Sequence, residues 1–110
     1  GQVGVIDFDK HDFEETGCTF GQADGLVNKA LEVEGVRMAV LASERDDGIK
    51  MSLRAVEPDT VNDIAVLFGG GGHAQAAGCT IHAPLHEALD QVLAAMKDKL
   101  DKTPRPEGRV

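Results

Sequence analysis

The sequence contains no tryptophan or tyrosine, and its four phenylalanines are the only aromatic rings apart from histidine. Proteins that hold long single strands of nucleic acid stack the bases on aromatic side chains, so a stacking platform of that kind is not expected. Basic residues are also few, because 11 Lys and Arg stand against 19 Asp and Glu, for a formal net charge of -8. The chain is therefore not expected to hold long nucleic acid through its overall charge. An anionic ligand would have to bind at a local basic site.

Cysteines and long apolar runs are scarce as well. Cys18 and Cys79 are too few and too far apart for a disulfide framework or a zinc site. No apolar run approaches the roughly 20 residues of a membrane helix, and no basic start followed by an apolar stretch indicates a secretory signal. We therefore expect a cytoplasmic protein with no membrane contact.

Hydrophobic periodicity predicts one α/β domain built on a mixed sheet of about four strands, with helices packed on it, in the order β-α-β-β-α-β-α. Strands are expected at 3–8, 36–43, 49–56 and 77–83, with a hairpin turn at 46–48. Residues 36–43 are apolar at nearly every position, as in a strand covered on both faces, whereas 49–56 alternates. Residues 1–100 form the predicted domain, and 101–110, with two prolines and little to bury, form a predicted disordered tail.

Capping residues predict where the helices begin. Asp24 is expected to cap a helix that ends near Gly35, and Asp59 or Thr60 is expected to cap a second, with Asp63 completing a T-x-x-D pattern. The third helix begins at Leu85 and has an apolar stripe that indicates core packing.

Four consecutive glycines, residues 69–72, precede His73. Glycine runs can cradle phosphate, because the bare backbone amides approach an anion closely. A Walker loop is excluded because no Lys with Ser or Thr follows, and a dinucleotide fingerprint is excluded because this run leaves a helix instead of a strand. A helix C-cap with a flexible turn is the alternative, although a C-cap requires only one glycine.

Ser52 and Arg54 are predicted on the polar face of the alternating strand, one helix upstream of His73. If that helix folds back onto the sheet, these three side chains and the glycines converge on one anion. The alternative is an Arg54 that pairs with a nearby carboxylate on a solvated face.

The string FGGGGHAQAAGCTI, together with KMSLRA and TVNDIAVLF, resembles the DHH-associated domain at the C-terminus of DHH-family phosphoesterases. The resemblance extends from Val3 to Leu100 and is strongest to the branch of oligoribonucleases and phosphoadenosine-phosphate phosphatases. It implies that manganese and catalysis belong to an N-terminal DHH domain of the same chain. This segment is then an inactive lobe that binds a short oligonucleotide or small nucleotide, without a metal or cofactor of its own.

Carried over by position, the resemblance assigns six residues to substrate binding and none to catalysis: Ser52, Arg54, Gly70, Gly71, Gly72 and His73. The resemblance also implies that the loop packs closely behind the ligand, which explains the small residues Ala76, Ala77 and Gly78. Members of the family often carry a hydroxyl after the arginine and a basic residue after the histidine, where this chain has Ala55, Ala74 and Gln75. The thinner positive charge favours a short ligand over a long strand.

Two other functions are compatible with the sequence. A similar domain ends alanyl-tRNA synthetases, so the chain is also compatible with a C-terminal appendage of a tRNA-synthetase-like protein. The acidic segment from Asp7 to Glu15, in which Asp7, Asp9 and His11 alternate, is compatible with a small metal-binding or interaction domain.

Overall fold

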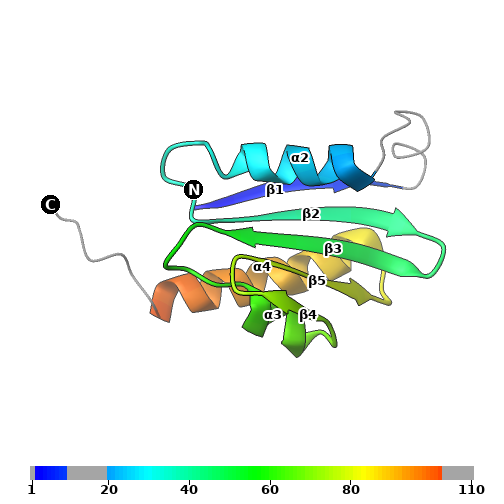
Figure 1. Cartoon of the computed structure of the whole chain (residues 1–110). Coiled ribbons are helices and arrows are strands. Elements are labelled where there is room, and N and C mark those ends of the chain that lie inside the picture. Colours follow the sequence, from blue (N-terminus) through cyan, green and yellow to red (C-terminus); the bar gives the residue numbers. More distant parts are fainter. Residues whose placement is uncertain (1, 10–19, 103–110) are drawn as a thin grey trace, which may run out of the picture.

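A computed structural model of the chain describes residues 2–9 and 20–102. Its strands are β1 (Val3–Phe8), β2 (Met38–Arg45), β3 (Gly48–Ala55), β4 (Gly71–His73) and β5 (Ala76–Ile81), and its helices are α2 (Phe20–Ala30), α3 (Asn62–Leu67) and α4 (Leu85–Lys102). The strands form one sheet in the order β1-β2-β3-β5-β4 (Figure 1). β1 pairs with β2 in parallel, and the other neighbours are antiparallel. The predicted class, a mixed sheet with helices packed on it, is confirmed.

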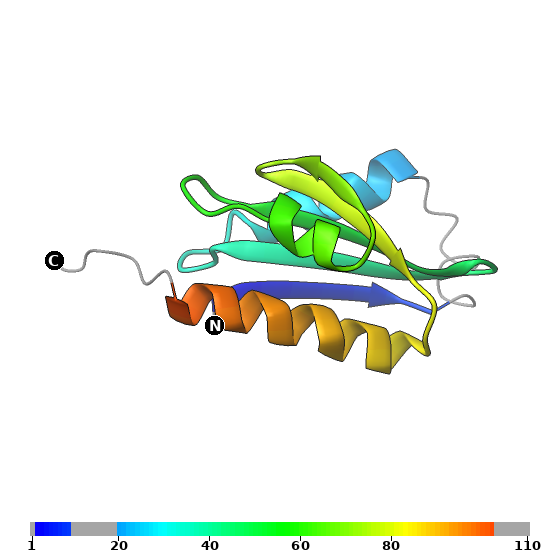
Figure 2. The ribbon, with the colours of Figure 1, turned by 90° about the horizontal axis from the view of Figure 1, so that it is seen from below.

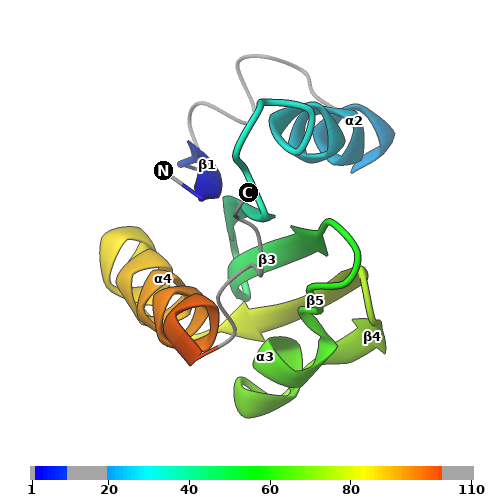
Figure 3. The same cartoon turned by 90° about the vertical axis from the view of Figure 1, so that its left-hand side faces the viewer.

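The helices divide between the two faces of the sheet. Figure 3 shows α2 on one side and both α3 and α4 on the other. Val27 of α2 packs on Ala39 and Leu41, and these two residues face the same way as Arg54 and Ser52 because they are their direct partners across β2 and β3. Figure 2, seen from below, shows α4 running along the opposite face.

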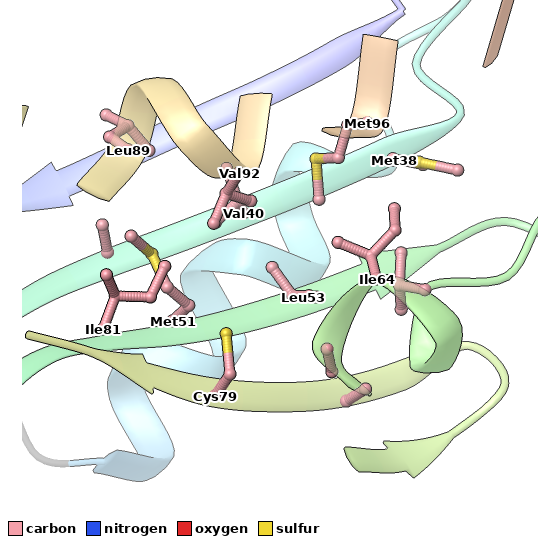
Figure 4. Packing of buried hydrophobic residues seen from close by; sticks show 14 of the residues in the cluster. Met38, Val40, Met51, Leu53, Ile64, Cys79, Ile81, Leu89, Val92 and Met96 are labelled. Atoms are coloured by element: carbon pink, nitrogen blue, oxygen red, sulfur yellow. The ribbon is translucent and has the colours of Figure 1, made fainter. Parts of the chain in front are cut away.

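The larger core lies between the sheet and the helices α3 and α4 (Figure 4). The inward side chains of β3 alternate with outward ones as the sequence predicts, with Met51 and Leu53 fully buried and Lys50 exposed. All residues of β2 from Met38 to Ser43 are buried, which confirms the strand covered on both faces. One face of β3 is therefore fixed in the core, so its polar residues must point to the other.

The predicted helix caps are wrong, although the helices exist. α2 begins at Phe20, before Asp24, and α3 has Val61 at its N-cap with no side-chain hydrogen bond. Asp59 instead accepts two hydrogen bonds from Arg37. A capping side chain is recognised in sequence only by its local spacing, and a distant cation competes for the same oxygen atoms.

Strand β4 was missed by the sequence analysis. It consists of Gly71, Gly72 and His73 and pairs with β5, so this part of the glycine run is a short edge strand instead of a flexible turn. Glycine disfavours strands, and the pairing depends on tertiary contacts that periodicity does not reveal.

The last helix, α4, continues to Lys102. Asp101 and Lys102, which the sequence analysis assigned to the disordered tail, are therefore helical. The rest of the predicted tail, residues 103–110, lies outside the described residues. Within the described ranges, no helix is both long enough and apolar enough to cross a membrane.

Candidate functional site: a basic groove on the open half of the sheet

One half of one sheet face carries no helix in the part of the chain that the structure describes. α2 packs over β1 and β2 and also approaches β3, and Figure 3 shows it at the end of the sheet away from β5 and β4. The neighbouring strands β3, β5 and β4 turn the same face outward. A groove of about 530 Å³ lies there, open to solvent, and it is lined by Lys50, Met51, Ser52, Arg54, Gly71, Gly72, Ala76, Ala77 and Gly78.

The strand register explains how the groove is built. Ser52 pairs with Gly78, and Gly78 pairs with Gly71. In this row across three strands, Ser52 is therefore the only residue with a side chain. Directly opposite residues share a sheet face, and the row therefore forms a floor of exposed backbone beside the Ser52 hydroxyl. Chain segments of this kind let a ligand approach the main chain closely.

The next row on the same face carries the side chains of Arg54 and His73. Arg54 pairs with Ala76, and Ala76 pairs with His73. With strands about 4.8 Å apart, the Cα atoms of Arg54 and His73 are separated by about 10 Å across the small Ala76. His73 is exposed at the end of β4 and borders the groove without lining it.

The charge of the groove is opposite to that of the chain. Lys50 and Arg54 are among its described lining residues, and none of those residues is acidic, whereas the whole chain carries a net charge of -8. Two of the three carboxylates that the sequence offered as partners for Arg54 form other ion pairs, since Asp59 binds Arg37 and Asp63 binds Lys99. The third, Glu57, is exposed. The groove is thus a local basic site of the kind that the composition requires for an anionic ligand.

The first glycine of the run ends helix α3. Gly69 adopts a positive φ of 84°, and its amide donates to the Val66 carbonyl at 3.0 Å. The Gly70 amide donates to the Ala65 carbonyl at 2.8 Å. These two bonds form a Schellman motif, so the C-cap alternative accounts for one of the four glycines.

The next three glycines differ in what lies beside them. A Cβ atom added to Gly70 would collide with the Gly78 carbonyl, and one added to Gly72 would lie 2.6 Å from Ala77 Cα. A Cβ atom on Gly71 would meet nothing within 4 Å. Close packing therefore requires Gly70 and Gly72, whereas the space above Gly71 is left open and belongs to the groove.

This difference predicts opposite outcomes for two alanine substitutions. Gly71→Ala is expected to change the free energy of unfolding by less than about 0.5 kcal/mol but to weaken anion binding, because its methyl group projects into the groove. Gly70→Ala is expected to lose about 1–3 kcal/mol of stability, because β4 must shift away from β5. Urea unfolding and nucleotide titration of both variants test this, and equal stability of the two would contradict it.

The turn that follows His73 is fixed by the segment between β3 and α3. The Val61 amide donates to the Ala74 carbonyl at 2.7 Å, and the side-chain amide of Gln75 donates to the Asp59 carbonyl at 2.9 Å. Gln75 therefore positions the turn by binding backbone, in a place where the family resemblance suggested a basic side chain nearby. The position of the His73 end of β4 therefore depends on the position of Asp59.

Asp59 is itself anchored by a buried ion pair. Arg37 donates from Nε to one carboxylate oxygen of Asp59 at 2.8 Å and from a terminal nitrogen to the other at 2.6 Å. The two side chains are only 3% and 6% exposed. Hydrogen bonding to Asp59 raises the pKa of the Arg37 guanidinium, against the lowering effect of burial and together with the opposite charge of Asp59. The hydrogen bond to Asp59 thus favours the charged form of the Arg37 guanidinium.

A second cation ties α4 to the start of α3. Lys99 Nζ donates to the Thr60 carbonyl, the Thr60 hydroxyl and an Asp63 carboxylate oxygen, each at 2.6 Å. Burial raises the pKa of Asp63, but the hydrogen bond and charge of Lys99 outweigh burial and hold the pKa below its usual value. The pairing of Asp63 with Lys99 therefore stabilises the folded state above the ordinary carboxyl pKa. This stabilisation is lost as the pH falls through the pKa of Asp63 in the folded state.

The structure brings together four of the six predicted site residues: Ser52, Arg54, Gly71 and Gly72. Gly70 packs beneath the groove instead of lining it, and His73 borders it. Lys50 was not assigned to the site, although its place two residues before Ser52 on an alternating strand is the signal that would have included it.

Metal ligands are not gathered among the residues that the structure describes. Among residues 2–9 and 20–102, no three His, Cys, Asp or Glu side chains form a group that could hold a metal ion. Asp7 and Asp9 are exposed at the end of β1, and the rest of the acidic segment, including His11, lies outside the described residues. The described residues therefore do not fit a manganese site.

Comparison with known families now identifies the fold and its context. The model of the DHHA1 domain matches residues 3–102 of this chain. The chain belongs to the DHHA1 domain family. This confirms the resemblance to the DHH-associated domain of DHH-family phosphoesterases.

One relative of this DHHA1 domain is the bifunctional oligoribonuclease and PAP phosphatase NrnA of Thermus thermophilus. It is 35% identical over 81 residues, which are 73% of this chain and 25% of the relative. The chain thus spans about a quarter of the length of this relative.

Two solved structures share the DHHA1 fold. An exopolyphosphatase-related protein from Bacteroides fragilis superposes with a TM-score of 0.82 at 27% identity, over 93% of this chain and 30% of the other. The C-Ala domain of Aquifex aeolicus alanyl-tRNA synthetase superposes with a TM-score of 0.64 at 14% identity, over 87% of each chain. The second similarity is one of fold alone.

Proposed function

We propose that this DHHA1 domain is the substrate-binding lobe of a metal-dependent phosphoesterase that acts on short oligonucleotides or small nucleotides in the cytoplasm. Arg54 binds a substrate phosphate through charge-assisted hydrogen bonds, Ser52 and the amides near Gly71 complete the anion site, and His73 bonds to phosphate or sugar. The observation that carries the proposal is the groove itself, in which Lys50 and Arg54 lie beside a glycine floor in an acidic chain.

The lobe is proposed to work beside an N-terminal DHH domain that supplies manganese and the activated water. The described residues of this segment are proposed to contribute binding and orientation of the substrate, through the groove that Ser52 and Arg54 line. The short groove, without an aromatic side chain among its described lining residues, suits one or two nucleotides better than a long strand. Holding the phosphate at a fixed place is a large part of catalysis in such reactions.

Calorimetric titration of the chain with a nucleoside 3′,5′-bisphosphate, a 5′-phosphorylated dinucleotide and a long single-stranded RNA tests the proposal. We expect binding of the two short ligands, no preference for the long strand and no hydrolysis by the segment alone. Absence of binding to all three would overturn the proposal. Binding of structured tRNA without binding of small nucleotides would favour the tRNA-synthetase alternative.

A further inference from the structure

The turn that joins β4 to β5 links two of the side chains that are proposed to hold the ligand. It consists of Ala74 and Gln75, since His73 ends β4 and pairs with Ala76, the first residue of β5. Ala76 is in turn the partner of Arg54 on β3. The conformation of this turn therefore sets where His73 lies relative to Arg54.

The turn lacks the backbone geometry that stabilises hairpins of this length. Two-residue hairpins favour type I′ and II′ turns, in which the first central residue has a positive φ, because these turns match the twist of the strands. Ala74 would be that residue here, but no described residue other than glycine has a positive φ. Strand β4 adds little support, since it has three residues, two of them glycines, and lies at the edge of the sheet. Hydrogen bonds from outside the hairpin are therefore needed to fix the turn.

Gln75 ties the turn to the rest of the fold at two points. Its carbonyl accepts from the Ala55 amide at 3.1 Å, and its side-chain amide donates to the Asp59 carbonyl at 2.9 Å. A further bond runs from the Val61 amide to the Ala74 carbonyl at 2.7 Å. Of these bonds, only the one from the Gln75 side chain depends on which side chain is present, so a substitution can remove it alone.

The segment that receives the Gln75 side chain is itself anchored from two sides. The Asp59 carboxylate lies in the buried ion pair with Arg37. The next residue, Thr60, accepts hydrogen bonds from Lys99 of α4 through its carbonyl and its hydroxyl. The acceptor carbonyl is therefore held in place by side chains that do not line the groove. A donor that binds a fixed acceptor fixes its own backbone as well, and here that backbone is the turn.

We propose that Gln75 is a positioning residue for ligand binding: its side chain fixes the turn, and the turn holds His73 at a set place relative to Arg54. This inference rests on the proposed function, in which Arg54 and His73 bind the substrate. Gln75 is not among the described residues that line the groove, so it acts through His73 and not through a contact of its own with the ligand.

Gln75→Met removes the hydrogen-bond donor and keeps an unbranched side chain of similar length. It is expected to weaken binding of a 5′-phosphorylated diadenylate about two- to tenfold in calorimetric titration, which is the range for one hydrogen bond. In NMR spectra of the free chain, the ring signals of His73 should shift. Gln91→Met is the matched control, since Gln91 is exposed on α4, and it should change neither the affinity nor the His73 signals.

A double-mutant cycle separates positioning from a general loss of structure. In the His73→Ala background, Gln75→Met should have no further effect on affinity, because the side chain that it positions is gone. Wild-type affinity in Gln75→Met, or the same loss in both backgrounds, would overturn the positioning role while binding of the ligand by Arg54 stands. Absence of diadenylate binding by the unmodified chain would overturn both.

Discussion

Replacing Arg54 by alanine is expected to weaken binding of a nucleoside 3′,5′-bisphosphate about 10- to 100-fold, which is the range for losing hydrogen bonds to a charged group. Arg54 belongs to the same row as His73 and lines the groove. Its loss removes the fork that orients the phosphate, and the backbone floor alone does not supply a compensating charge. Calorimetric titration measures the effect directly.

Three further variants separate this explanation from a general loss of charge or fold. Arg54→Lys keeps the charge without the planar fork, and we expect it to recover only part of the affinity. Lys97→Ala removes a cation outside the groove and should bind as the wild type. His73→Ala should cost less than Arg54→Ala, because His73 borders the groove without lining it. Wild-type affinity in Arg54→Ala would show that the ligand binds elsewhere.

The sequence predicted the strands and helices that depend on local periodicity. The alternation from Ile49 to Ala55 correctly predicted which side chains of β3 enter the core, and this assignment placed Ser52 and Arg54 together on the open face. Residues of the candidate site could therefore be predicted from the sequence where the alternation within one strand fixes the direction of a side chain.

The separate roles of the four glycines could not be predicted from the sequence. Gly69, Gly70, Gly71 and Gly72 are identical in composition, yet one caps a helix, two relieve close packing against β5 and one faces open space. These differences arise from the pairing of β4 with β5, which is a tertiary contact. A run of identical residues contains no local information that distinguishes such roles.

The ion pair of Arg37 and Asp59 was missed for a related reason. The residues are 22 positions apart, and the polarity of Asp59 before a helix indicated a cap. Arg37 lies at the entrance to β2, immediately before its first residue. Only the fold shows that Arg37 is buried against Asp59. The pair links that entrance to the segment that holds the turn after His73, through the Gln75 hydrogen bond to the Asp59 carbonyl.

Breaking this pair is expected to have the largest effect on stability. Arg37→Met leaves the Asp59 carboxylate buried without its cation, and Asp59→Leu does the reverse, so each should lower the free energy of unfolding by about 3–5 kcal/mol. Small domains have only about 5–15 kcal/mol in total, so a measurable fraction of either variant can unfold at moderate temperature. Urea unfolding curves give both values.

The double variant Arg37→Met, Asp59→Leu tests whether the loss comes from an uncompensated charge. With both charges removed, the destabilisation should be well below the sum of the single effects, because neither side chain remains buried and unpaired. The exposed pair of Lys102 and Asp98 on α4 is the control, and Lys102→Ala should change stability by less than about 1 kcal/mol. Additive losses in the double variant would mean that packing of the two side chains, and not their charge pairing, holds this segment in place.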